Sequence, residues 1–175
     1  MRKLHIGGKV RAPGWEVINA IPGPHVDHLG NAKDLSRFEA ATFTDVYASH
    51  VLEHFDYKDE IFVTMFEWCR VLVPGGSLHV SVPDLDILAR LFLDRERLSK
   101  ADRFMVMRMI FGGHLDQYDY HLVGLNDELL MDLLSKTGFT NIRRVAQLGL
   151  FEDTSTVIFC GVPISLNMTA VKAKP

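Results

Sequence analysis

The sequence predicts an α/β domain built on a mostly parallel sheet. Three consecutive segments carry this prediction: a β-like stretch at 45–48, apolar residues at helical spacing over 62–73, and a short apolar run at 78–82. Pro74-Gly75-Gly76 ends the helical pattern. A short apolar run of this kind is typical of a strand buried on both faces of a parallel sheet. Together the segments predict one βαβ unit, whose crossover is right-handed.

Length and composition indicate one domain that spans 1–175. The chain has 175 residues, of which 47% are hydrophobic, so it can bury a substantial core. A net charge of −3, with scattered lysines and arginines, argues against nucleic-acid binding. The absence of an apolar leader and of any apolar run near 20 residues predicts no secretion and no membrane span. Cys69 and Cys160 follow no metal spacing, which favours free thiols in a reducing cytoplasm.

The beginning of the chain departs from an ordinary α/β pattern. Residues 3–6 predict a strand that ends at Gly7-Gly8, and residues 16–21 predict the next strand. Only residues 9–15 lie between them, whereas a helical crossover needs about a dozen residues. We therefore expect an extended connection in place of the first helix. The missing helix should leave an apolar face of the sheet bare, and a second copy of the chain could cover it in a homodimer.

The remaining elements follow from capping signals and periodicity. The expected elements are a third strand at 25–29, helices opening at Asp84 and Ser99, a helix capped by Asn126, and two final antiparallel strands at 142–148 and 166–172. The β-like segment 155–162 has no assigned place. Residues 112–124 form a polar, aromatic loop with glycines at its start, and such loops tend to carry function when a rigid scaffold holds them.

The central part of the chain resembles a known family. The resemblance is carried by GNAKDLSRF (30–38), DVYASHVLEHF (45–55) and EWCRVLVPGGSLHVSVPD (67–84), with VLEH and RVL-x-PGG as the most specific marks. These motifs resemble the type 11 group of class I S-adenosylmethionine-dependent methyltransferases over roughly 30–88. The resemblance implies a Rossmann-like sheet, mostly parallel with an antiparallel closing strand, and S-adenosyl-L-methionine as the cofactor.

The resemblance also implies a set of cofactor-binding positions. They are Ile6, Gly7, Gly8, Asn19, Asp34, Leu35, Ser49 and His50. The turn at Gly7-Gly8 is thinner than the family pattern of an acidic residue and three small ones, and it also suits an ordinary turn. Asn19 stands where the family has a carboxylate that accepts both ribose hydroxyls, which would weaken binding by about 10-fold to 150-fold. Asp34 also suits the role of a helix cap for the turn at 35–39.

Methyl transfer is an in-line displacement in which alignment alone contributes up to about 7–11 kcal/mol. A hydroxyl acceptor would gain a further 10²- to 10⁴-fold, roughly, from a general base. His50 is the first candidate, followed by Tyr118 and His121 in the loop 112–124, which we interpret as the wall of the substrate site. A packed connecting loop is the alternative for that segment. Glu53 and His54 are expected to hold the following helix in place.

The leading hypothesis is S-adenosylmethionine-dependent methyl transfer to an unknown small-molecule or protein acceptor. The alternative is a catalytically silent, methyltransferase-like binding or partner subunit, which the thin glycine turn, the missing helix and Asn19 favour. A metal site at His114, Asp116 and His121, joined by His50 or His54, is a third possibility because nitrogen and oxygen ligands suit zinc or manganese. Its spacing matches no established motif, so the sequence predicts no metal.

Overall fold

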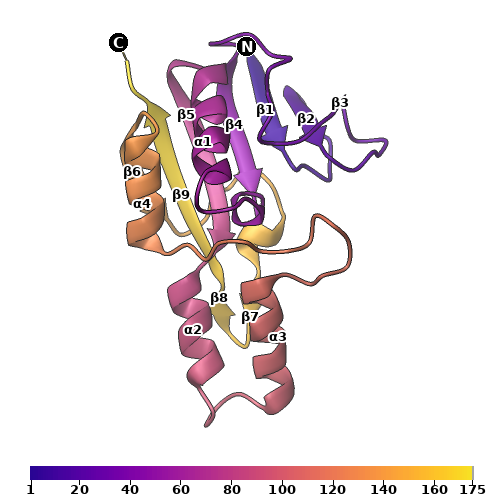
Figure 1. Ribbon diagram of the computed structural model, residues 1–175, viewed down its shortest axis with the longest axis vertical. Helices are drawn as coiled ribbons and strands as arrows, with labels where there is room; N and C mark the ends of the chain where they lie inside the picture. Colours follow the sequence, from indigo (N-terminus) through magenta and orange to yellow (C-terminus); the bar gives the residue numbers. More distant parts are fainter. Residues whose placement is uncertain (175) are drawn as a thin grey trace.

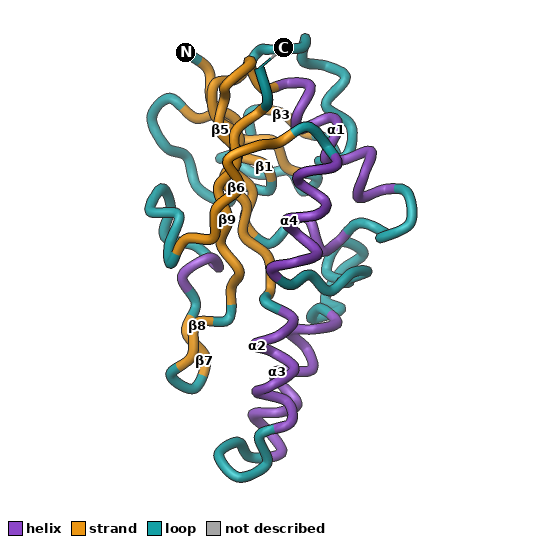
Figure 2. The backbone as a smooth tube through the Cα atoms, turned by 90° about the vertical axis from the view of Figure 1, so that its left-hand side faces the viewer, coloured by secondary structure: helices purple, strands orange, loops and turns teal. Residues whose placement is uncertain are grey.

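The computed structural model describes residues 1–174 and shows one mixed sheet with helices on one side of it (Figures 1 and 2). The strand order is β3-β2-β1-β4-β5-β9-β6. The first five strands of this order are parallel, and β9 runs antiparallel to both β5 and β6. The strands are β1 (Arg2–Ile6), β2 (Trp15–Asn19), β3 (His28–Leu29), β4 (Phe43–Ser49), β5 (Leu72–Pro83), β6 (Phe139–Val145) and β9 (Ser165–Lys172). The predicted fold class is confirmed.

Two helices pack on the sheet and two extend beyond it. Helices α1 (Glu60–Val71) and α4 (Asp127–Lys136) cover one face, while α2 (Leu85–Leu93) and α3 (Lys100–Phe111) form a hairpin past the end of β5 (Figures 1 and 2). Asn126 caps α4 as predicted, because its side chain accepts a hydrogen bond from the backbone of Leu129. No helix within residues 1–174 is both long and apolar enough to cross a bilayer.

The connection from β1 to β2 contains no helix, as the sequence predicted. Gly7 leaves β1 with φ +71°, and its N–H donates to the carbonyl of Ile18 at 2.8 Å. Gly14 has φ +78° just before β2, a conformation that glycine adopts at little cost. The chain therefore returns along the sheet in an extended path.

The two faces of the central strands differ in composition. Leu4, Val46 and Leu78 are fully buried beneath α1 and α4, in one cluster with Trp68. The neighbouring residues along the same strands point to the opposite face, and they are mostly polar or aromatic: His5, Asp45, Tyr47, Ser49, His79, Ser81 and Asn167. The expectation of a bare apolar face is therefore wrong. Residues 78–82 of β5 are buried or half-buried on both faces, as predicted, but His79 and Ser81 make one of these faces polar.

A segment from the other end of the chain covers part of the polar face. Phe151 packs against His5 and Tyr47, with ring centroids 4.1 Å and 4.6 Å away. Asp153 accepts hydrogen bonds from the hydroxyls of Tyr47 at 2.7 Å and Ser49 at 3.1 Å. Residues 146–157 thus act as a strap over the face that has no helix.

Two further details differ from the sequence-based prediction. Strand β5 begins at Leu72, directly after α1, and passes through Pro74-Gly75-Gly76 with a register shift relative to β4. The segment 155–162, which had no assigned place, holds η2 (Thr154–Thr156), β7 (Ile158–Phe159) and the start of β8 (Val162–Pro163). Phe159 and Val162 pack against the small apolar cluster of α2 and α3, which explains why this segment is apolar.

Candidate functional site

A cleft of about 640 Å³ lies at the carboxyl ends of β1, β2, β3 and β4. The strand order reverses between β1 and β4, and open α/β sheets bind ligands at such a switch point. Residues 115–120 and Leu122 from the loop 112–124 form the opposite wall. The loop thus lies where the sequence placed the substrate wall.

Gly7 lines the cleft at the end of β1. A Cβ at this position would lie 2.5 Å from Cγ2 of Val51, and the φ of +71° disfavours other residues. Gly8 is buried instead, and a Cβ there would lie 2.8 Å from the His5 ring. Both glycines therefore make room for a neighbouring side chain: Gly7 for Val51, which also lines the cleft, and Gly8 for His5.

Asn19 lines the cleft at the end of β2 and connects the two neighbouring turns. Its amide donates to the carbonyl of Gly8 at 3.1 Å, and its side-chain oxygen accepts from the backbone of Ile21 at 2.9 Å. An asparagine has two donor hydrogens and two acceptor lone pairs, so each end of the amide keeps one further bond for a ligand.

The segment after β3 presents different residues from those the sequence selected. Asp34 is exposed and accepts a hydrogen bond from the backbone of Ser36 at 3.0 Å, while Leu35 is fully buried in the core. Neither lines the cleft, whereas Asn31 and Ala32 do. The position of Asn31 directly after Gly30, at the end of β3, is the sequence signal that could have identified it.

The other predicted residues fall into three environments. Ile6 is fully buried in the core, and Ser49 points to the polar face, where it contacts Asp153. Tyr118 lines the cleft with a side chain that is 42% exposed. His50 also lines the cleft, and His121 lies beside it on the loop.

The hydrogen bonds of His50 determine which of its ring nitrogens carries the proton. The Ser165 hydroxyl donates to the carbonyl of Thr154 at 2.9 Å, so its oxygen accepts from Nε2–H of His50, also at 2.9 Å. Nδ1 therefore presents a lone pair, 3.4 Å from Oε1 of Glu53. Burial, reinforced by the neighbouring His121, lowers the pKa of His50 to about 3. His50 is thus neutral, and both of its nitrogens face protein groups.

Glu53 lies at the centre of the histidines. It is 1% exposed, and within residues 1–174 neither carboxyl oxygen has a hydrogen-bond partner. Burial raises the pKa of this carboxyl to about 8. His50 and His121 lie within ion-pair distance of it, but burial lowers the pKa of both rings, so neither forms an ion pair with Glu53 at neutral pH.

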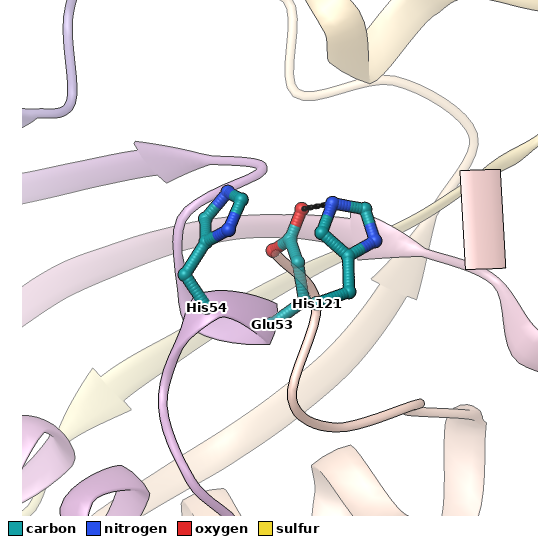
Figure 3. A group of neighbouring side chains, drawn as sticks. All are labelled: Glu53, His54 and His121. Atoms are coloured by element: carbon teal, nitrogen blue, oxygen red, sulfur yellow. Dashed lines mark ion pairs between the residues drawn. The ribbon is translucent and has the colours of Figure 1, made fainter. Parts of the chain in front are cut away.

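His54 and His121 complete the group (Figure 3). His121 Nδ1 donates to the carbonyl of Met109 at 3.0 Å, and its Nε2 lies 3.9 Å from Oε1 of Glu53. His54 Nδ1 donates to the carbonyl of Tyr120 at 3.0 Å. Donor atoms of Glu53, His54 and His121 all lie within 4.8 Å of one another, the one such group among the described residues. It shares only His121 with the core of the metal set considered from the sequence.

Comparison with known proteins shows which proteins share this fold. Residues 18–80 match a family model described as a methyltransferase domain. No curated protein matches the chain. A SAM-dependent methyltransferase from Archaeoglobus fulgidus is 13% identical, with a TM-score of 0.62, over 98% of this chain and 86% of that one. The chain has the class I methyltransferase fold. The resemblance carried by residues 30–88 is thereby confirmed.

Two other methyltransferase structures are similar to this chain. The CurJ carbon methyltransferase is 17% identical with a TM-score of 0.61, and 99% of this chain spans about half, 49%, of that one. The Burkholderia thailandensis 1,6-didemethyltoxoflavin-N1-methyltransferase, solved with bound 1,6-didemethyltoxoflavin and S-adenosylhomocysteine, is 14% identical with a TM-score of 0.60, over 98% of this chain and 71% of that one.

The cleft of this methyltransferase fold suits the cofactor of the family. Its volume lies within the range of roughly 300–1,000 Å³ that is usual for small-molecule sites. Gly7 brings its backbone to the cleft wall without a side chain, and Asn19 and Asn31 offer amides along the same wall. Lys9 adds positive charge for a carboxylate, whereas Lys33 is paired with Glu60, which also lines the cleft. At the end of β2, however, this chain has Asn19 where the family has an acidic residue.

The sequence assigned Glu53 and His54 to holding the following helix, and the structure also brings both side chains next to His121. The carbonyl of Glu53 accepts a hydrogen bond from the backbone N–H of Leu122 at 2.8 Å. That bond joins the VLEH turn to the loop 112–124. The sequence signal for this group was one carboxylate and three histidines: Glu53, His50 and His54 in the motif and His121 in the loop. The sequence does not show, however, that the loop packs against the motif.

Proposed function

We propose that the protein transfers a methyl group from S-adenosyl-L-methionine to a small-molecule or protein acceptor. The observation that carries this proposal is the cleft at the carboxyl ends of β1–β4, lined by Gly7 and Asn19 on one side and by residues 115–120 and Leu122 on the other. The match of residues 18–80 to a methyltransferase domain supports it. The same support extends to the cofactor, because that family takes its methyl group from this donor.

The cofactor would be held by Gly7, Asn19 and Asn31, with His50 at the end of β4. Asn19 and Asn31 would donate to the ribose and adenine ends through their amides. When bound, S-adenosylmethionine supplies an electrophilic methyl group on its sulfonium. The protein's part is to align the acceptor and to exclude water, and alignment can contribute up to about 7–11 kcal/mol.

The loop 112–124 would contact the acceptor. Tyr118 presents an exposed side chain on the cleft wall, so we assign it the most direct contact of the three catalytic candidates. His50 and His121 each donate one ring N–H to a protein oxygen and point the other nitrogen at Glu53. In this proposal they shape the wall and do not remove a proton from the acceptor.

A silent binding or partner subunit is the second candidate function. The observation that favours it is the Asn19 amide, which already bonds to Gly8 and Ile21 and carries no charge for the ribose. Turnover separates the two candidates, since a silent relative binds the cofactor without producing S-adenosylhomocysteine. A cytoplasmic location and a homodimer belong to the same proposal; light scattering at micromolar concentration tests the dimer.

Calorimetric titration with S-adenosylmethionine and S-adenosylhomocysteine tests the cofactor site. We expect micromolar binding that Asn31→Ala weakens by about 10-fold, the effect of one lost hydrogen bond. Asp34→Ala is the matched control, because Asp34 lies three residues away and outside the cleft, and it should leave the affinity unchanged. Absence of binding up to millimolar ligand, or weakening by Asp34→Ala alone, would contradict the proposal.

A further inference from the structure

Two imidazole nitrogens, His50 Nδ1 and His121 Nε2, lie 3.4 Å and 3.9 Å from Oε1 of Glu53, and a ring nitrogen of His54 lies within 4.8 Å of the same carboxyl group. A backbone carbonyl only accepts hydrogen bonds, so the nitrogen of His121 that faces Met109 O carries the proton, as does the nitrogen of His54 that faces Tyr120 O. Each ring therefore keeps a lone pair on its Nε2. The Nδ1 lone pair of His50 faces the same carboxyl at 3.4 Å.

This arrangement is the one that metal-binding histidines adopt. A ligating histidine usually donates its other N–H to a backbone carbonyl or a carboxylate, which fixes the tautomer and orients the ring. His54 and His121 both do so here, through carbonyls from separate segments of the chain. Their rings are 4.9 Å apart and turned by 73°, so they do not stack on each other.

The carboxyl of Glu53 is the second, independent observation. It is almost completely buried, yet neither oxygen has a hydrogen-bond partner within residues 1–174. A buried carboxyl without partners is costly, and each such group calls for an explanation, for which an ion is one of the usual kinds. The backbone role of Glu53 does not provide one, because it needs only the main-chain carbonyl.

We propose that Glu53, His54 and His121 bind a divalent transition-metal ion beside the cleft, where the lone pair of His50 Nδ1 lies 3.4 Å from the Glu53 carboxyl group. Two nitrogens and one carboxylate suit zinc, and the same set suits manganese or iron. A tetrahedral zinc site with bonds of about 2.0–2.2 Å places its ligand atoms roughly 3.3–3.6 Å apart. The Glu53–His121 distance of 3.9 Å is only slightly wider.

The sequence predicted no metal, and the set that it weighed differs from this one. His114 stacks on Tyr120 at 4.1 Å, and its Nε2 faces the carbonyl of Phe111 at 2.9 Å. Asp116 accepts from the backbone of Tyr118 at 2.7 Å. These contacts stabilise the loop, and the two side chains are not part of the group around Glu53.

The position of the site suggests what the ion would do. His54 lines the cleft, so an ion held by the three side chains adjoins the space between β4 and the loop 112–124. A divalent ion binds a hydroxyl or carbonyl oxygen and lowers the pKa of a bound hydroxyl. If the proposed methyl transfer holds, the acceptor is therefore a molecule with an oxygen that coordinates the ion. This consequence rests on the proposed function, whereas metal binding does not.

Metal binding is measured on the full chain without cofactor. Protein freed of metal by chelator dialysis is titrated with Zn²⁺ and Mn²⁺, and Co²⁺ is added to record visible absorption bands of the bound ion. We expect one equivalent of Zn²⁺ and a cobalt spectrum. Loss of an outer-shell partner costs 10- to 100-fold in metal affinity, so Glu53→Gln and His54→Ala, which remove direct ligands, should each weaken binding by at least about 100-fold.

His25→Ala is the matched control, because His25 is another partly accessible histidine on a different loop, and its metal affinity should equal that of the unaltered chain. Should Glu53→Gln fail to fold by circular dichroism, His54→Ala and His121→Ala decide the question. No uptake of the three ions up to millimolar concentration would overturn the proposal. Unchanged uptake in both histidine variants would overturn it equally. Because S-adenosylmethionine is absent, a failed cofactor site does not affect either result.

Discussion

The two faces of the central sheet are built from alternate residues of the same strands, yet they are stabilised differently. Leu78 and Val80 of β5 are fully buried under α1 and α4, whereas His79 between them points to the face that has no helix. On the helical face, apolar area removed from water provides the stability. On the other face, hydrogen bonds to Asp153 and packing of Phe151 hold a strap in place. The face of a sheet therefore needs no covering helix when its side chains are polar and a strap packs over them.

The largest expected effect on stability comes from a comparison of two neighbouring residues of β5. Leu78→Ala should reduce the free energy of unfolding by about 2–5 kcal/mol, because it leaves a cavity in a fully buried cluster. His79→Ala, one residue along, should cost less than about 1 kcal/mol, since its Nδ1 has no hydrogen-bond partner within residues 1–174 and its Nε2 makes only a long contact of 3.5 Å with Asp45. Urea denaturation followed by circular dichroism measures both. Equal losses from the two variants would break the distinction between the faces.

A second test removes one attachment of the strap. Tyr47→Phe keeps the ring packed against Phe151 but deletes the hydroxyl that donates to Asp153 at 2.7 Å. A hydrogen bond to a charged group contributes about 1.5–3 kcal/mol, and we expect a loss of this size in urea denaturation. Proteolysis of the native protein should also shift toward residues 146–157. A variant as stable as the unaltered chain would show that the strap depends on packing alone.

A third test concerns pH and His5. Burial lowers the pKa of His5 from 6.5 to about 4, although Asp153 opposes this shift. As the pH falls through 6.5 the unfolded chain takes up a proton first, so the contribution to stability is complete above about 6.5 and declines down to about 4. His5→Phe should flatten this part of the stability curve in denaturation series from pH 7 to 4. Parallel curves for the two proteins would refute the assignment.

Much of the fold follows from local sequence signals. The helical spacing over 62–73 and the cap at Asn126 predicted α1 and α4, and the seven residues 9–15 excluded a helix by length alone. The polar face was not predicted, because an alternating strand such as Leu78–Val82 looks apolar when only its hydrophobic members are counted. Its partners Phe151 and Asp153 lie far away in the chain, and sequence spacing does not show that they return to β4.

The site was predictable where it depends on strand ends and not where it depends on loops. Gly7, Asn19 and His50 end their strands and line the cleft, so topology alone places them. The sequence analysis selected Asp34 because the resemblance gives that position a carboxylate near the adenine. In the structure the turn after β3 leaves Asp34 exposed and outside the cleft, and Asn31 lines the cleft instead. Glu53 gains its environment from His121 in the loop, whose approach depends on tertiary packing.

Amide hydrogen exchange with and without S-adenosylhomocysteine tests the central claim most directly. The account predicts slower exchange on ligand addition at 18–21, 30–33 and 115–122, the segments around the cleft. Residues 146–157, which cover the polar face, should exchange at the same rate in both samples. Protection of 146–157 without protection of 18–21 would place the ligand on the other face of the sheet and contradict the cleft as the cofactor site.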